Sequence, residues 1–178
     1  MNARRACLII SIVWQLASAF CVAQEKTSTS VKDDSIIIAA REIMGAQKYC
    51  ALVTIDSSGK ANIRTMNPFP PEQDMTVWMA TNIRSRKVKE IRNNPKVVLY
   101  YANHAQATGY VAITGRAVLV DVMEEKMKRK RDYWSQAFPD WKYLILIKVI
   151  PEKLEVINYK HKLENAPDTW DPPSVEFK

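Results

Sequence analysis

Residues 49–66 read YCALVTIDSSGKANIRTM, and this pattern predicts a β-hairpin. The run Tyr49–Ile55 is short, apolar and rich in strand formers, and Ala61–Met66 alternates apolar with polar side chains. Between them, Asp56 can hydrogen-bond the backbone of a turn, and Gly59 can adopt a positive φ. Two strands joined by so short a turn pair in the antiparallel sense.

The segments around the hairpin predict a mostly β fold. A helix is expected at about 36–47, with Ile36, Ile37, Ala40, Ile43 and Met44 on one face. After prolines 68, 70 and 71, four more strands and two helices follow. Six strands with short helices favour a β-barrel with flanking helices, closed or partly closed, and antiparallel. The later strands are expected at 75–80, 96–101, 110–120 with a bulge at Gly115, and 143–158, bent or split at Pro151; the helices at 85–93 and 123–137.

Length and composition fit one globular domain. The chain has 178 residues, of which 47% are hydrophobic and 25% charged. We expect the barrel to occupy residues 35–160 and an irregular tail to occupy 161–178. Four glycines are too few for a glycine-rich phosphate loop, and His104, His161 and Cys50 lack metal-ligand spacing. The sequence therefore predicts no metal site.

The first 23 residues have the layout of a signal peptide. Arg4 and Arg5 precede an apolar run, and small residues follow before Gln24. Cleavage after Ala23 would leave a polar, flexible leader at 24–34 and an exported protein, periplasmic or secreted, without a stable membrane span. A lipoprotein form attached at Cys21 and a retained N-terminal anchor are the alternatives.

Charge does not indicate a nucleic-acid partner. The chain carries 26 Lys and Arg against 19 Asp and Glu. Removal of Arg4 and Arg5 leaves 24 − 19, or +5, which suits a small anion as well as it suits nucleic acid. The run EEKMKRKR at 124–131 lacks interleaved aromatic residues, and we interpret it as the solvated face of a helix.

A cluster of bases lies where a strand is followed by a helix, at 81–87. Ser85 is a good N-cap residue. The first turn of a helix attracts acids, yet no acid occurs here before Glu90. The bases present instead are Arg84, Arg86 and Lys87.

This arrangement suits a bound phosphate. Free N–H groups, the Ser85 hydroxyl and two or three cations converge on a small volume, and Arg64 from the hairpin could add a guanidinium to the same anion. The alternative is that these basic side chains simply extend into water.

The pattern as a whole resembles the pyridoxamine 5′-phosphate oxidase-like flavoproteins, and is most similar to their general stress protein branch. The resemblance covers about 36–158, nearly all of the expected domain. It rests on ALVTI at 51–55, NIRTM at 62–66, VWMAT at 77–81, SRKV at 85–88, NPKV at 94–97 and YVAITG at 110–115.

The resemblance implies an FMN-binding split barrel that forms a homodimer, with flavin in clefts at the subunit interface. Arg64 and Lys87 would bind the FMN phosphate, and Ser85 would donate its hydroxyl. The isoalloxazine ring would be contacted by Thr65 and Met66 and by Trp78 to Thr81.

The sequence also departs from true pyridoxamine phosphate oxidases. Their substrate-binding C-terminal segment has no counterpart in 159–178, and Gln106 is a doubtful match for their flavin-contacting glutamine. Oxidation of vitamin B6 is therefore not expected. The function predicted is an exported FMN-dependent oxidoreductase of unknown substrate, with no catalytic residue identified; the alternative is a flavin- or haem-binding module without turnover.

Overall fold

The computed structural model describes residues 33–177, so the expected signal peptide and most of the leader lie outside the described residues. Residues 33–46 form a helix. Among 33–177, no helix has the length and apolar character needed to cross a membrane. The remaining elements are β1 (Cys50–Ile55), β2 (Ala61–Met66), β3 (Val77–Asn82), α2 (Arg86–Asn93), β4 (Lys96–Ala102), β5 (Gly109–Val120), α3 (Met123–Lys128), α4 (Trp134–Ala137), β6 (Leu144–Asn158) and β7 (Ser174–Glu176), with short 3-10 turns at Trp141–Tyr143 and Tyr159–His161.

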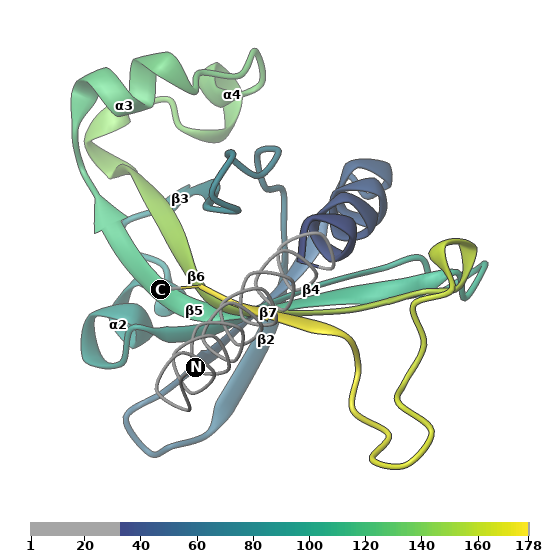
Figure 1. Cartoon of the computed structure of the whole chain (residues 1–178). Coiled ribbons are helices and arrows are strands. Elements are labelled where there is room, and N and C mark those ends of the chain that lie inside the picture. Colours follow the sequence, from purple (N-terminus) through teal and green to yellow (C-terminus); the bar gives the residue numbers. More distant parts are fainter. Residues whose placement is uncertain (1–32, 178) are drawn as a thin grey trace, which may run out of the picture.

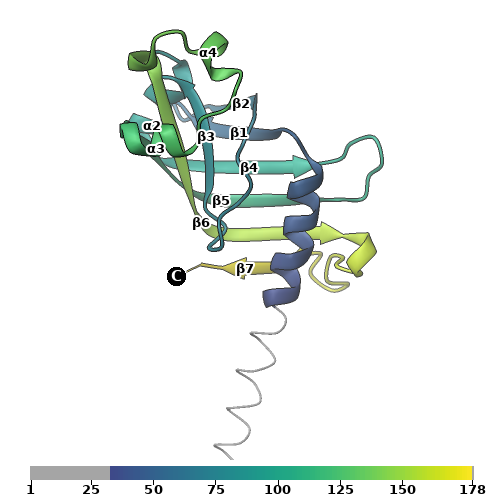
Figure 2. The same cartoon turned by 90° about the horizontal axis from the view of Figure 1, so that it is seen from above.

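One curled antiparallel sheet organises the molecule (Figure 1). The strand order is β2-β1-β4-β5-β6-β3, and β7 also pairs with β6. The long β6 takes β3 along its first half and β7 along its second half, both antiparallel. The helix at 33–46 crosses β4, β5 and β6 at one end of the sheet (Figure 2). The predicted mostly β split barrel is confirmed.

The predicted hairpin forms with the expected pairing. Register runs from Cys50 opposite Met66 to Ile55 opposite Ala61. The Asp56 carboxylate accepts hydrogen bonds from the backbone N–H groups of Ser58 and Lys60. This Asx-type turn explains why the chain reverses where it does.

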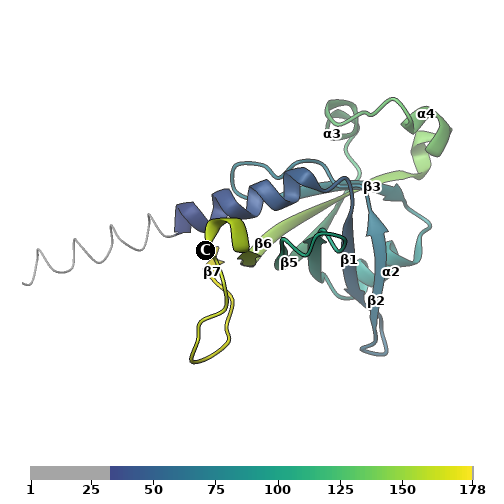
Figure 3. The same cartoon turned by 90° about the vertical axis from the view of Figure 1, so that its right-hand side faces the viewer.

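Two elements differ from the prediction. The charged helix expected at 123–137 is two short helices, α3 and α4, which lie together beyond β3 (Figure 3). The tail expected to be irregular contributes β7, a seventh strand, because Val175 packs into the core opposite Leu154.

The charged run at 124–131 is not simply a solvated face. Lys126 and Arg129 are buried, and Lys126 pairs with Asp121. Arg129 pairs with Glu72 at 2.7 Å and lies 3.7 Å from the ring centre of Trp78. Ion pairing and contact with an aromatic ring offset the hydration that these two buried cations lose. Residue type alone does not reveal such burial.

Gly115 is the site of the expected bulge. The register between β5 and β6 shifts between Thr114 and Gly115. A Cβ atom at Gly115 would lie 2.2 Å from the Ile150 carbonyl oxygen. The close backbone approach therefore requires glycine.

Gly115→Ala is expected to destabilise the protein by roughly 2–3 kcal/mol, because backbone atoms must shift to admit the methyl group. Chemical denaturation measures the change. Gly45→Ala is the control, since nothing lies within 4 Å of its added Cβ. Equal unfolding midpoints for the two variants would contradict the proposed contact.

Candidate functional site

The beginning of α2 brings a lysine against a threonine of β3. Lys87 donates a hydrogen bond from Nζ to Thr81 Oγ1 at 3.0 Å. Ser85 occupies the N-cap position, but its side chain makes no capping hydrogen bond. Its Oγ lies 3.4 Å from Thr81 Oγ1. Two hydroxyl groups and an ammonium group thus meet where the free N–H groups of α2 begin.

Arg64 and Glu90 form the inner part of the same site. The Arg64 guanidinium lies 2.7 Å from the Glu90 carboxylate, and Glu90 is 3% exposed. Arg64 also donates to Thr54 Oγ1 at 2.5 Å, and Thr54 donates to Glu90 at 2.5 Å. Arg86 Nε lies 3.1 Å from the second Glu90 oxygen, although without hydrogen-bond alignment.

Glu90 is the functional residue that the sequence interpretation missed. It supplies one negative charge to a site that contains the cations Arg64, Arg86 and Lys87, so the cluster keeps a surplus of 3 − 1, or +2. The spacing of Arg86 and Glu90, four residues apart on a helix, is a signal that could have indicated this pair. The surplus matches the charge of a phosphate monoester at neutral pH.

Lys87 is electrostatically unsatisfied. Burial lowers its pKa below the usual range, and the nearby Arg64 and Arg86 guanidinium groups add to that effect. Glu90 opposes the shift without cancelling it. An anion bound beside Lys87 would relieve the repulsion and restore part of the lost solvation.

The stability of the ligand-free protein should therefore depend on pH through Lys87. The folded state releases the Lys87 proton at a lower pH than the unfolded state, so the destabilising effect of Lys87 is full below the folded pKa. It disappears as pH rises from the folded pKa towards 10.5. We expect Lys87→Met to be more stable than the wild type at pH 7, with a difference that shrinks as the pH rises towards 10.5.

Urea denaturation of both proteins from pH 7 to pH 10.5 measures this difference. A gap between them that stays constant across the range would show that Lys87 is not the titrating group.

Arg84 does not join the cluster. Its guanidinium lies 3.9 Å from the ring centre of Tyr143 and donates to the Tyr143 hydroxyl at 2.7 Å. This aromatic stacking stabilises the turn before α2. Arg86 is another of the bases at 81–87, and unlike Arg84 it lies beside the buried Glu90 carboxylate.

The residues expected at a flavin ring lie in different environments. Met66 is buried in the core, and Thr65 is exposed because its side chain points to the opposite face of β2. Trp78 is 5% exposed and lies against Arg129 on the loop that ends α3. The structure thus groups Arg64, Thr81, Ser85 and Lys87, whereas Met66 and Trp78 are buried in hydrophobic clusters and Thr65 is exposed on the other face of β2. Their contact with a ring stays a prediction.

Comparisons with known proteins agree with the fold and with the resemblance seen in the sequence. Residues 36–161 match the family model described as pyridoxamine 5′-phosphate oxidase. General stress protein 26 of Bacillus subtilis is 26% identical over 129 residues, which covers 68% of this chain and 87% of that protein.

Solved structures show the same fold at low identity. General stress protein 26 of Bacillus anthracis aligns with a TM-score of 0.62 and 21% identity, covering 78% of this chain and 96% of that one. A related protein from Clostridium acetobutylicum gives 0.67 and 16%, covering 82% and 96%. An FMN-binding protein from Nostoc punctiforme gives 0.51 and 16%, covering 80% and 93%. The chain belongs to the pyridoxamine 5′-phosphate oxidase family, within which it resembles the general stress proteins.

Proposed function

We propose that this protein binds FMN and serves as an FMN-dependent oxidoreductase. The observation that carries the proposal is the surplus positive charge beside Lys87, at the beginning of a helix that follows a strand. Lys87 and Arg64 would hold the phosphate, while Thr81 and Ser85 would offer hydroxyl groups. The Nostoc punctiforme relative, whose structure is described as FMN-binding, supports the choice of cofactor.

Bound FMN would supply the redox chemistry, and the chain would supply binding and electrostatics. Arg64 cannot swing freely, because its guanidinium also donates to the carbonyl oxygens of Leu52 and Asn62. The same nitrogen, Nη1, also donates to Thr54, while Nη2 donates to Glu90. The phosphate-binding face is therefore set before the ligand arrives, which lowers the entropy cost of binding.

We further propose a homodimer. Ile63, on the edge strand β2, is 68% exposed. Tyr100 and Tyr110 are stacked on the same side of neighbouring strands, with ring centres 5.6 Å apart. An apolar sheet face of this kind is suited to pack against a second copy. Light scattering of the flavin-loaded protein that gave the mass of one chain would contradict a shared cleft.

Export is proposed from the N-terminal sequence alone. The mature protein isolated from its native compartment should begin at Gln24, outside the cytosol, and N-terminal sequencing measures this. A retained Met1 would refute cleavage, and a lipid attached to Cys21 would establish the lipoprotein form instead.

A second candidate function is a flavin- or haem-binding module without turnover. The titratable groups of the site favour it, because Glu90 is engaged by Arg64 and Lys87 by Thr81. With Lys87 also assigned to the phosphate, neither group would be available as a general acid or base.

Absorption spectroscopy of the purified full chain distinguishes the candidates. A band at ~450 nm that bleaches with a reductant and returns with an oxidant supports an oxidoreductase. A flavin band that neither bleaches nor returns during turnover assays with nicotinamide donors supports the binding module. Protein that stays colourless after incubation with FMN would refute both flavin proposals.

A further inference from the structure

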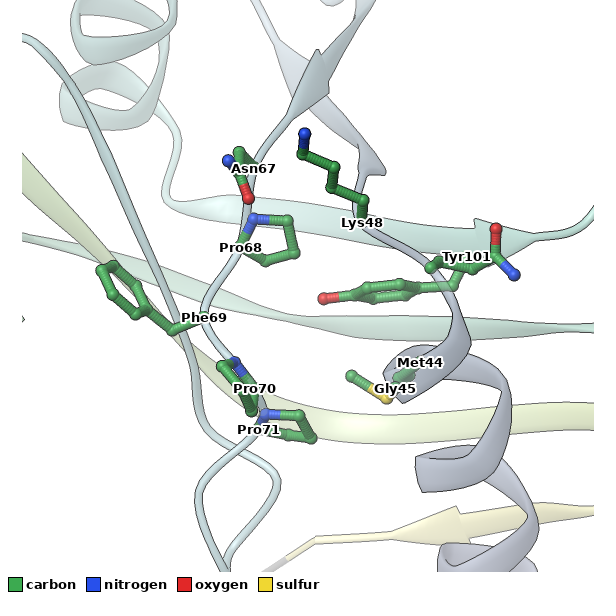
Figure 4. A pocket seen from close by; sticks show the side chains of 10 residues that line it. Met44, Gly45, Lys48, Asn67, Pro68, Phe69, Pro70, Pro71 and Tyr101 are labelled. Atoms are coloured by element: carbon green, nitrogen blue, oxygen red, sulfur yellow. The ribbon is translucent and has the colours of Figure 1, made fainter. Parts of the chain in front are cut away.

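Two cavities lie at the end of the helix at 33–46, against different faces of that helix. The first is lined by Met44 and Gly45 and by the prolines that follow β2 (Figure 4). The second is lined by Glu42 and Ala46 together with the loop between β4 and β5 and the end of β6. The volume of this second cavity is about 210 Å³, well above the ~15 Å³ that one water molecule needs. It can therefore hold a small organic molecule.

Asn158, the last residue of β6, brings a free acceptor to the second cavity. The residue is 3% exposed, and its Nδ2 donates to the Ala39 carbonyl oxygen at 3.1 Å. That bond fixes the orientation of the side-chain amide. The Oδ1 oxygen accepts no hydrogen bond from residues 33–177, and unlike the Tyr101 hydroxyl it is not shielded from solvent. A ligand with a donor group can satisfy it.

The other uncharged polar side chains of the second cavity are amides and a hydroxyl. The side chains of Gln47 and Thr108 make no hydrogen bond with any of residues 33–177. Gln106 accepts at Oε1 from Asn103 at 2.9 Å and keeps its own amide N–H groups for a ligand. The cavity thus offers donors and acceptors together.

The charged side chains beside the second cavity are already paired with one another. Lys160 Nζ lies 2.5 Å from one Glu42 oxygen, and the His161 ring lies 2.6 Å from the other. Hydrogen bonds from Lys160 and His161 lower the pKa of Glu42, so its carboxylate stays charged at neutral pH. A charged ligand would have to compete with these contacts, whereas an uncharged ligand would not.

The loop between β4 and β5 forms an ordered wall of the second cavity. Asn103 Oδ1 accepts from the backbone N–H groups of Ala105 and Gln106, which makes an Asx turn. The Thr108 carbonyl oxygen accepts from the Tyr159 N–H at 3.4 Å and ties the loop to the chain after β6. The cavity is therefore preformed, as ligand sites usually are.

We propose that the second cavity binds an uncharged polyhydroxylated compound of the size of a monosaccharide. One hydroxyl donates to Asn158 Oδ1, and others bond to the side chains of Gln47 and Thr108. Every hydroxyl both donates and accepts, so one polyol can satisfy all of these groups, whereas an apolar ligand would leave the Asn158 oxygen without a partner. Neither Arg64 nor Lys87 lines the cavity, so this site does not depend on FMN.

Sugars that differ in charge test the chemistry of the second cavity. D-glucosamine carries an ammonium group and D-glucuronate a carboxylate, while D-glucose carries no charge. We expect the full chain to bind D-glucose, D-galactose or D-mannose at least roughly tenfold more tightly than either charged sugar, because no counter-charge is free for them. Saturation-transfer NMR measures the affinities. Absence of binding by all three neutral sugars, or equal binding of a charged one, would overturn the proposal.

Adjacent positions of the helix provide a blocking variant and its matched control. Ala46→Leu should abolish sugar binding, because Ala46 is exposed and lines the second cavity. Gly45→Leu should bind normally, since Gly45 lines only the first cavity and nothing lies within 4 Å of its added Cβ. Unchanged binding by Ala46→Leu would overturn the proposal.

Two further variants locate the bound sugar. Thr108→Val keeps the side-chain shape and removes the hydroxyl, and it should weaken sugar binding by roughly fivefold, as the loss of one hydrogen bond predicts. Lys87→Met should bind the sugar normally. Loss of sugar binding in Lys87→Met with unchanged binding in Thr108→Val would show that the sugar occupies the phosphate site. That result would refute this proposal while leaving the FMN proposal intact.

Discussion

Lys87→Met is expected to weaken FMN binding by roughly 10- to 100-fold, because it removes a charge-assisted hydrogen bond to the phosphate. The same substitution should raise the stability of the ligand-free protein, since burial and two neighbouring guanidinium groups disfavour the Lys87 ammonium. Opposite effects on binding and stability distinguish a ligand-binding lysine from a structural one. Fluorescence quenching of FMN measures the Kd, and urea denaturation measures the stability.

The matched control is Lys89→Met. Lys89 lies on the same helix but is exposed. It should change FMN affinity by less than about twofold and leave stability nearly unchanged. An identical loss of affinity in both variants would mean that net charge, and not the site, attracts the cofactor. Riboflavin, which lacks the phosphate, should bind the wild type and Lys87→Met equally.

Glu90→Gln is expected to destabilise the ligand-free protein by about 3 kcal/mol, because it leaves the Arg64 guanidinium without its buried counter-ion. Arg64 keeps 17% side-chain exposure, which places the effect at the lower end for a broken buried pair. Gln keeps the shape and one acceptor oxygen, so the change isolates the charge. Thermal and urea unfolding measure it.

The phosphate site predicts that ligand reverses part of this loss. Glu90→Gln raises the charge surplus of the cluster from +2 to +3, so inorganic phosphate or FMN should raise its Tm more than that of the wild type. Equal shifts in Tm would show that the anion binds elsewhere.

Glu152→Gln serves as the control for the loss of a carboxylate. Glu152 is 48% exposed and lies 3.9 Å from Arg116. Exposed pairs of this kind contribute little, so we expect a change below about 1 kcal/mol. A large effect of Glu152→Gln would mean that stability follows total charge and not the buried pair.

The order and type of most elements could be predicted from the sequence because they depend on local properties. Alternation at 61–66 and the Asx turn at Asp56 are set by residues near one another in the chain. The bulge at Gly115 is marked in the sequence by its glycine, although it forms only where β5 pairs with β6. Strong short-range signals of this kind also made the family recognisable from the residues themselves. The weaker strand β7 has three residues and depends on pairing with β6, which local pattern cannot show.

The sequence predicted only part of the cluster formed by Arg64, Arg86, Lys87 and Glu90. The sequence predicts that Arg64 and Lys87 bind one anion. In the folded chain the Arg64 charge lies near enough to lower the pKa of Lys87, and the shared anion stays a prediction. That Glu90 turns inward to meet Arg64, 26 residues away, depends on how α2 packs on β1. Arg84 and Arg86 differ by two positions, yet they point to different partners.

The sequence by itself determined the antiparallel barrel, the family and the chain position of the basic residues before α2, because hydrophobic period, turn chemistry and spacing are local. The tertiary structure alone decided which charges are buried and which polar groups lack partners. Lys126 and Arg129 are buried, and the buried Tyr101 hydroxyl has no hydrogen-bond partner among residues 33–177. Burial and pairing arise from contacts across the fold, and free energies of solvation follow from those contacts.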